Sequence, residues 1–131
     1  MIAVLDVSAA IEIVLQRPLA EKFTAHVADA DWVIAPSLFI SEVTNVFWKY
    51  QKLADLPFLV CENGLDQAIE LPDNFIDERK LYREAFKLAC TLNHSAYDML
   101  YLVVARRNNG TLLTLDNKLL KAALKCSIEV N

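Results

Sequence analysis

The chain has 131 residues, of which 55% are hydrophobic, and its formal net charge is −4. This length and apolar fraction predict a single folded domain over residues 1–131 and exclude a globally disordered chain. The negative charge is not that of a high-affinity nucleic-acid binder. It does not exclude a nuclease, because a cluster of metal-binding acids lowers the net charge by itself.

No apolar run approaches the ~20 residues that a membrane helix needs, so we expect no membrane span. The first six residues carry no basic region and no cleavage-site pattern, which predicts a complete small protein without a signal peptide. The three cysteines, Cys61, Cys90 and Cys126, are far apart and lack paired metal spacing. We therefore expect buried, reduced thiols in a cytoplasmic protein.

The first half of the chain alternates between short apolar runs and helical patterns. Residues 2–5 and 32–35 are predicted strands, because each is a short apolar run that a turn residue ends. Ser8 is a candidate cap for the first helix, and Pro18 suits the first turn of the second. The predicted helices of this half are 9–16, 19–29, 38–53 and 57–70.

The second half is mostly helical. Helix 78–92 is amphipathic, whereas helix 96–108 is apolar nearly all round and is predicted to lie in the interior. Phe75-Ile76 is too short to assign. The remaining predicted elements are a strand at 111–115, a helix at 118–125 and a last strand at 127–130. Strands separated by helices imply an α/β fold, with a parallel sheet covered by helices on both faces.

Four acids stand at the edges of apolar segments, namely Asp6, Glu42, Asp98 and Asp116. A lone carboxylate beside buried surface is costly, and four that converge repel one another unless cations lie between them. Two of them follow predicted strands, at the sheet edge where α/β proteins bind ligands. The pattern therefore indicates a divalent-metal site, and metal sites of this kind often cleave phosphodiesters.

Each acid also has a simpler structural interpretation. Asp6 and Asp116 could be turn residues or helix caps, and Glu42 and Asp98 could complement helix N-termini. The face of helix 38–53 that carries Glu42 also carries Asn45 and Lys49, which makes Lys49 a candidate contact for an RNA phosphate.

Other polar and aromatic residues favour structural roles. Lys118, Lys121 and Lys125 could bind phosphates but are expected to form a solvated helix face. Tyr97 and Tyr101 could stack on bases, but their spacing in an apolar segment favours core packing. His26 and His94 are isolated in the sequence and predict no zinc site.

Several enzyme classes are excluded by the sequence. The only glycines are Gly64 and Gly110, so neither a P-loop nor a dinucleotide-binding fingerprint is possible, and no Gly-x-Ser-x-Gly elbow is present. A haloacid-dehalogenase-type phosphatase would need a second Asp where Ser8 stands. A phosphoacceptor signalling domain would need an acid pair after the first strand, where only Asp6 precedes Val7.

Four segments together resemble the ordered motifs of PIN domains, a family of metal-dependent ribonucleases whose small members include VapC-type toxins. The segments are Val4-Leu5-Asp6-Val7-Ser8, Ser41-Glu42-Val43, Ala96-Tyr97-Asp98-Met99-Leu100-Tyr101 and Leu113-Thr114-Leu115-Asp116-Asn117-Lys118-Leu119. The resemblance runs from residue 2 to about residue 126. It implies a three-layer α/β/α sandwich around a central parallel sheet.

The resemblance also implies roles for individual residues. Those that match the family's acidic cluster, which holds Mg²⁺ or Mn²⁺, are Asp6, Glu42, Asp98 and Asp116. Ser8 and Thr114 match hydroxyl positions that orient carboxylates or waters beside it. Some members carry a further acid where this chain has Asn117 and Lys118, so we expect a second metal to bind weakly or only with substrate.

The function implied is endoribonuclease activity on RNA, by the toxin of a type II toxin–antitoxin pair that forms a homodimer. Large apolar groups in residues 38–70, namely Phe47, Trp48, Phe58 and Leu59, could form a groove for an antitoxin helix. They could equally belong to the core or to a homodimer surface. The alternative function is a non-catalytic PIN-like module that binds RNA or protein.

Overall fold

The computed structural model describes the whole chain, residues 1–131. The elements up to the middle of the chain are β1 (Ile2–Leu5), α1 (Val7–Val14), α2 (Ala20–Asp29), β2 (Trp32–Pro36), α3 (Leu38–Leu53) and α4 (Phe58–Glu70). Those that follow are β3 (Asn74–Ile76), the 3-10 turn η1 (Glu78–Lys80), α5 (Tyr82–Leu92), α6 (Ala96–Arg107), β4 (Thr111–Leu113) and α7 (Asn117–Lys125).

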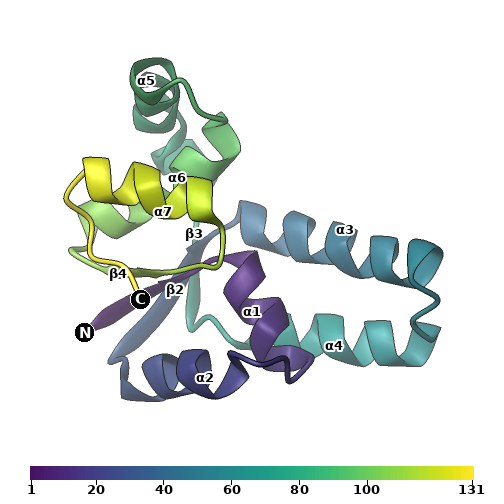
Figure 1. Cartoon of the computed structure of the whole chain (residues 1–131). Coiled ribbons are helices and arrows are strands. Elements are labelled where there is room, and N and C mark those ends of the chain that lie inside the picture. The colour runs from purple at the N-terminus through teal and green to yellow at the C-terminus, as the bar shows by residue number, and fades with distance from the viewer.

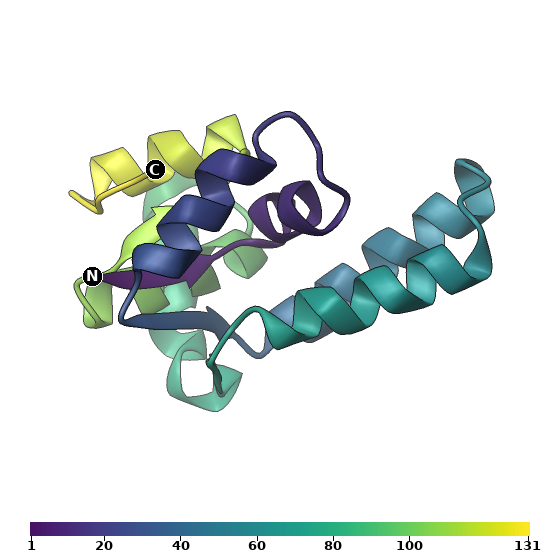
Figure 2. The same cartoon turned by 90° about the horizontal axis from the view of Figure 1, so that it is seen from below.

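The strands form one parallel sheet of four strands in the order β3-β2-β1-β4. Helices cover both faces of the sheet, with α2 and α7 on one side and α6 on the other (Figures 1 and 2). The predicted α/β fold with a central parallel sheet in a three-layer sandwich is therefore confirmed. Because β1 lies between β2 and β4, the chain segments that follow these three strands meet at one edge of the sheet.

Helix α6 is the interior helix of the fold. Every residue from Met99 to Ala105 is buried, as the nearly all-round apolar sequence of this helix predicts. It contacts β1, β2 and β4, and α5 covers its outer side. Because α6 is packed on all sides, a polar side chain that this helix presents at the sheet edge is held in a fixed position.

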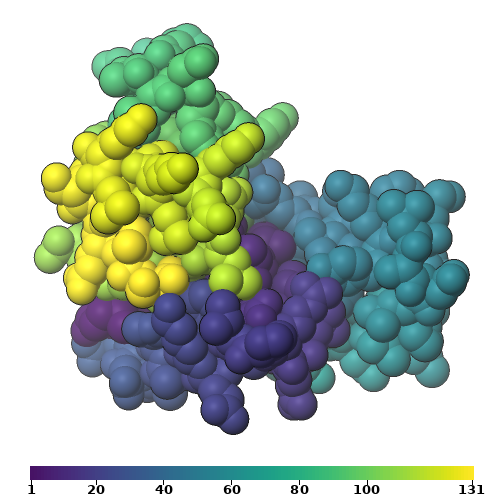
Figure 3. All heavy atoms as spheres, viewed as in Figure 1, coloured from purple at the N-terminus to yellow at the C-terminus, as the bar shows by residue number.

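Helices α3 and α4 pack against each other and project from the body as an antiparallel arm (Figures 1 to 3). Val43 and Phe47 are buried on the inner side of α3, and Cys61, Gly64 and Ala68 are buried on α4. The arm leaves large apolar side chains exposed at its surface, including Trp48 and Phe58. No helix of the chain is both long and apolar enough to cross a membrane.

Some predicted boundaries are wrong. Predicted helix 9–16 begins two residues earlier, at Val7, because Asp6 rather than Ser8 is the residue before the first turn. Predicted helix 78–92 is broken at Leu81 into a 3-10 turn and α5, since Asp77 caps the turn by accepting a hydrogen bond from Arg79 N–H. Phe75 and Ile76, left unassigned from the sequence, belong to the edge strand β3.

Three further predictions are corrected, two near the C-terminus and one among the cysteines. Predicted strand 127–130 is reduced to a single bridge between Leu112 and Val130, and Ser127 has a positive φ of 56° that bends the chain there. Predicted strand 111–115 ends at Leu113. All three cysteines are free thiols, but only Cys61 is buried, so the prediction that all are buried is wrong for Cys90, which is exposed, and for Cys126, which is half-buried.

Candidate active site

A cleft of about 480 Å³ lies at the edge of the sheet where the strands end. Its lining includes every member of the predicted acidic cluster, namely Asp6, Glu42, Asp98 and Asp116. Asp6 directly follows β1, and Asp116 follows β4 and begins α7. Asp98 comes from the first turn of α6, and Glu42 comes from the second turn of α3. The fold thus brings together carboxylates that are up to 110 residues apart in the sequence, from Asp6 to Asp116.

Asp6 is held by two hydroxyl groups. Ser8 Oγ and Thr114 Oγ1 both donate to Oδ2 of Asp6, at 2.7 Å and 2.6 Å. Each hydroxyl in turn accepts a backbone N–H, from Leu115 at 2.9 Å for Ser8 and from Asp116 at 3.0 Å for Thr114. A hydroxyl has one proton to give, so the backbone donors leave both protons directed at the Asp6 carboxylate.

These hydroxyls act against the effect of burial on Asp6. Burial raises the pKa of the Asp6 carboxyl above its usual value, while the hydrogen bonds from Thr114 and Ser8 lower it. The hydroxyls therefore favour the anionic form of the Asp6 carboxylate, whereas burial favours the protonated form. Both hydroxyls contact Asp6, and their role in orienting ligands of a metal stays a prediction.

The carboxyl group of Glu42 has a strongly raised pKa. Partial burial raises its pKa to about 7, the hydrogen bond from Tyr101 lowers it, and the nearby charges of Asp6, Asp98 and Glu78 raise it. The Tyr101 hydroxyl donates to Oε1 at 2.6 Å, which leaves Oε2 for another partner. Tyr101 is fully buried, as expected for core packing.

Asp98 has a neighbour that the sequence analysis missed. Burial raises the pKa of its carboxyl, His94 lowers it, and the charges of Asp116 and Asp6 raise it. Nδ1 of His94 lies 3.5 Å from Oδ2 of Asp98, and both ring nitrogens of His94 are buried without a hydrogen bond. The four-residue spacing was the available signal, but His94 lies in the short connection before α6, so helical periodicity alone does not specify this contact.

Asp116 is exposed and has a capping role. Its Oδ1 accepts the backbone N–H groups of Lys118 at 2.9 Å and Leu119 at 3.3 Å, and so caps α7. The interpretation of Asp116 as a helix cap is thus correct. The same side chain lines the cleft, and Oδ2 takes no part in the cap.

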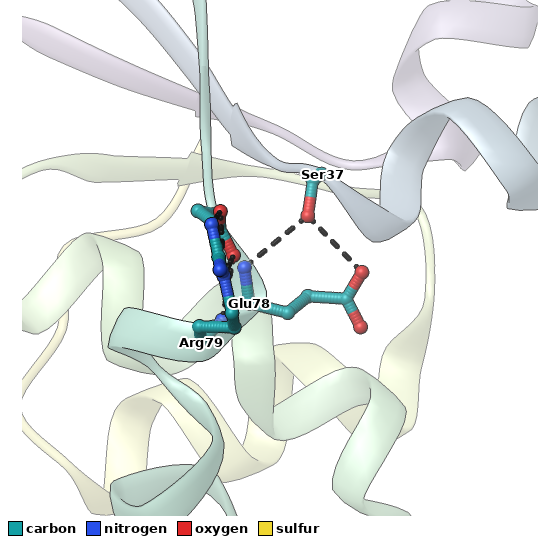
Figure 4. Close-up of polar contacts among 4 residues, drawn as sticks. Ser37, Glu78 and Arg79 are labelled. Carbon is teal, nitrogen blue, oxygen red and sulfur yellow. Dashed lines mark hydrogen bonds and ion pairs between the residues drawn. The ribbon is translucent and has the colours of Figure 1, made fainter.

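A further acid, Glu78, approaches the cleft from the end of β3. Ser37 Oγ donates to Oε2 of Glu78 at 3.0 Å and accepts the Glu78 backbone N–H at 3.2 Å, as Figure 4 shows. This pair ties the β2–α3 junction to η1. This contact was not predicted, because Glu78 was assigned to the start of a continuous helix over residues 78–92.

The carboxylates of the cleft are suitable ligands for a hard divalent cation, but they are not arranged as a preformed metal-binding cluster. The side chains offered are carboxylates, and Mg²⁺ prefers oxygen ligands. No three His, Cys, Asp or Glu side chains stand close enough to hold one ion together. An ion here would therefore be bound through one or two carboxylates and several waters, which is the usual way that proteins bind Mg²⁺. Burial is the main cause of the raised pKa values of Asp6, Glu42 and Asp98, and a bound cation would lower all three.

The remaining candidates have mixed outcomes. Lys49 and Asn45 line the cleft together with Glu42, as their shared helix face predicts. Tyr97 is 66% exposed, so the prediction that it packs in the core is wrong, because the first turn of α6 extends beyond the sheet. The residues Lys118, Lys121 and Lys125 are exposed, as expected of a solvated face. Arg17, which the sequence analysis did not single out, also lines the cleft.

Comparison with solved structures finds the same fold in three proteins of low sequence identity. PAE2754 from Pyrobaculum aerophilum is 20% identical with a TM-score of 0.76, over 98% of this chain and 81% of that chain. VapBC2 from Rickettsia felis, bound to a DNA fragment from their promoter, is 17% identical with a TM-score of 0.70, over 100% and 98%. FitAcB from Neisseria gonorrhoeae is 19% identical with a TM-score of 0.60, over 99% and 96%.

A search among curated proteins found no match. The family model for the PIN domain, in contrast, matches residues 3–125, which is nearly the whole chain and includes the four acids of the predicted cluster. Together with the parallel α/β fold, this match shows that the chain belongs to the PIN domain family.

Proposed function

We propose that the chain is an endoribonuclease that depends on Mg²⁺ or Mn²⁺ and hydrolyses RNA phosphodiester bonds in the acidic cleft. One observation carries the proposal, which is that the four acids of the predicted cluster, which come from four separate segments, line a single cleft at the edge of the sheet where the strands end, together with Glu12. Membership of the PIN family supports it, because PIN domains are generally nucleases.

Asp6 and Asp98 would be the main metal ligands, and Asp116 would bind directly or through a water. When bound, the metal supplies positive charge at the phosphate and lowers the pKa of water. The hydroxyls of Ser8 and Thr114 hold the Asp6 carboxylate in one orientation. Glu42, whose Oε1 is fixed by Tyr101, would use Oε2 to bind metal or to orient the attacking water.

The same proposal covers the strand of RNA around the scissile bond. Lys49 follows Glu42 by two helical turns on α3, and its exposed ammonium lies on the wall of the cleft. A lysine at this position would contact a phosphate as a point charge. It would also offset the acids, which otherwise repel an RNA strand.

We also propose that the protein is the toxin of a type II toxin–antitoxin pair and forms a homodimer in the cytoplasm. The similar structures include VapBC2 and FitAcB, which supports an antitoxin partner. A groove between α3 and α4 is lined by apolar residues such as Phe47, Trp48 and Phe58, and would accept one face of an amphipathic antitoxin helix. Light scattering gives the mass of the isolated chain, and a mass of one chain would contradict the dimer.

The second candidate is a PIN-like module that binds RNA or protein without cleaving it. The absence of three metal-ligating side chains close enough to share an ion is the observation that favours it. The two candidates differ in hydrolysis, because a module without catalysis would bind RNA equally well in Mg²⁺ and in EDTA and release no fragments.

The test is cleavage of single-stranded and structured RNA by the purified chain in Mg²⁺, Mn²⁺ or EDTA, with Asp98→Asn as the comparison. We expect fragments only with metal, and a loss of at least about 100-fold in the variant. Asp77→Asn, which removes a carboxylate that pairs with Arg79 away from the cleft lining, is the matched control. Cleavage that survives both EDTA and Asp98→Asn would refute the proposal.

A further inference from the structure

The loop between α1 and α2 brings a basic residue to the wall of the acidic cleft. Arg17 is exposed and lines the cleft, with its guanidinium 5.2 Å from the centre of the Tyr50 ring on α3. Arginine and tyrosine thus form a cation–π contact across two elements that face each other over the cleft. An arginine held beside a ring loses less rotamer freedom when it binds a ligand.

A buried carboxylate holds the loop that carries Arg17. Glu12 is only 7% exposed, and its Oε1 accepts the backbone N–H of Leu19 at 3.0 Å. The backbone N–H of Arg17 donates to the carbonyl oxygen of Glu12 at 3.0 Å, and Gln16 takes a positive φ of 50° to allow the turn. Burying a carboxylate is costly unless it is hydrogen-bonded, so the bond from Leu19 N–H to Glu12 indicates that the loop has a fixed conformation.

The charge at Arg17 is not neutralised by the protein. Arg17 and Lys49 are the basic residues of a lining that otherwise carries acids, and neither forms an ion pair or a side-chain hydrogen bond. The guanidinium lies on the ring instead of a carboxylate, so its N–H groups remain free to donate. A planar group with several N–H donors matches the oxygens of a phosphate, to which it can donate two bonds at once.

We infer that Arg17 binds a backbone phosphate of the RNA strand next to the one that is cleaved, on the side of the cleft formed by the α1–α2 loop. The strand would then pass between Arg17 on this loop and Lys49 on α3. This inference rests on the proposed function, and it adds a residue that positions the substrate without touching the reacting atoms. Contact with phosphate alone carries no preference for base sequence.

The competing explanation is structural, namely that Arg17 serves only to pack on Tyr50. A structural role would change the stability of the protein and leave RNA binding as it was. Arg83 provides a matched control, because its guanidinium also lies over a tyrosine ring, 5.8 Å from the centre of Tyr82, on α5 outside the cleft. Both Arg→Ala changes remove one positive charge and one arginine–tyrosine contact.

The test is binding of a fluorescent single-stranded RNA to Asp98→Asn protein, so that cleavage does not intervene, over a range of KCl concentrations. Arg17→Ala in this background should weaken binding about tenfold and should lower the slope of log K against log salt by about 0.7, the value for one lost contact with single-stranded phosphate. Arg83→Ala should change neither. Arg17→Lys keeps the charge and should keep the slope.

Cleavage by the otherwise native protein gives a second measurement. Arg17→Ala should raise KM about tenfold and change kcat less than about twofold, because the lost contact is remote from the reacting atoms. Equal affinities and slopes for the Arg17→Ala and Arg83→Ala proteins, both shown to be folded by thermal melting, would overturn the inference and leave the nuclease proposal standing. Absence of RNA binding by the Asp98→Asn protein with both arginines intact would instead count against the proposed function.

Discussion

The hydroxyl of Tyr101 donates a hydrogen bond of 2.6 Å to Oε1 of Glu42, and this bond joins the interior helix α6 to α3 at the wall of the acidic cleft. The residues are 59 positions apart in the sequence. Tyr101 is fully buried, so its ring fixes the hydroxyl in place. The bond therefore sets which oxygen of Glu42 is available for metal or water.

Tyr101→Phe removes this hydrogen bond and keeps the ring. We expect it to cost about 1–2 kcal/mol in the free energy of unfolding, because a buried bond to a carboxylate is lost. RNA cleavage should also fall, because Glu42 is no longer held in one orientation. Urea unfolding and initial cleavage rates measure the two effects. Tyr97→Phe on the exposed first turn of the same helix is the control, and an equal effect of both variants would contradict the account.

Thr114→Val tests the hydroxyl pair that holds Asp6. Valine has nearly the shape of threonine, but it leaves the Asp116 N–H without its acceptor and Asp6 without one donor. We expect a loss of about 1–3 kcal/mol in stability and about a tenfold rise in the Mg²⁺ concentration for half-maximal cleavage. Thr91→Val, which removes a hydroxyl bonded to the Lys87 carbonyl on exposed α5, should leave the Mg²⁺ requirement unchanged. A Mg²⁺ requirement that Thr114→Val also leaves unchanged would contradict the role given to the hydroxyl.

The raised pKa of Glu42 predicts how stability depends on pH when metal is removed with EDTA. With a pKa of about 7 in the folded protein and 4.5 as the ordinary value, the folded state binds more protons between these two pH values. The free energy of unfolding therefore falls as pH rises through this window and levels off above it. The raised pKa values of Asp6 and Asp98 act in the same direction.

Glu42→Gln should remove Glu42's part of this pH dependence while still accepting the Tyr101 hydrogen bond. Relative to wild type, the variant should gain about 1–2 kcal/mol between pH 4.5 and 7, a range that allows for screening of a partly exposed side chain. Urea unfolding at several pH values measures the difference. Glu62→Gln, on the exposed side of α4, should track the wild type throughout. A constant difference between Glu42→Gln and wild type would contradict the assignment.

Gly64→Ala tests the packing of the α3–α4 arm. A Cβ at Gly64 would lie 2.8 Å from Cε1 and Cζ of the buried Phe47 ring, so the ring would have to shift from its packed position. The resulting strain of about 1–3 kcal/mol should exceed the gain of about 1 kcal/mol from replacing a helical glycine. Asn63→Ala, one residue away and exposed, should be neutral or slightly stabilising in thermal melting. An increase in Tm for Gly64→Ala would show that the arm packs differently.

Much of the fold could be predicted from local patterns. The all-round apolar run of α6 predicts its burial, and the short apolar runs of β1 and β2 predict buried strands. The meeting of Asp6 and Asp116 also follows from the sequence, because both come after strands and parallel strands end at the same edge.

Contacts that depend on how elements pack could not be predicted. The pairing of Arg17 with Tyr50 joins a loop to a helix that lies beyond an intervening helix and strand, and no local pattern specifies it. Tyr97 and Tyr101 share a helix face, but the sheet ends before the first turn of α6, so only Tyr101 is buried. Periodicity shows which face of a helix is apolar, while the length over which that face is covered depends on the neighbouring elements.

The proposal that the acids of the cleft support RNA cleavage is tested most directly by cleavage rates in Mg²⁺. Four variants each replace one acid of the cleft with its amide. Asp6→Asn, Glu42→Gln, Asp98→Asn and Asp116→Asn each remove one charge with little change in shape, and Asp77→Asn is the control outside the cleft lining. We expect each cleft variant to fold and its rate of RNA cleavage to fall at least about tenfold, while Asp77→Asn retains the wild-type rate. Full activity in the Asp6→Asn and Asp98→Asn proteins would contradict the proposal.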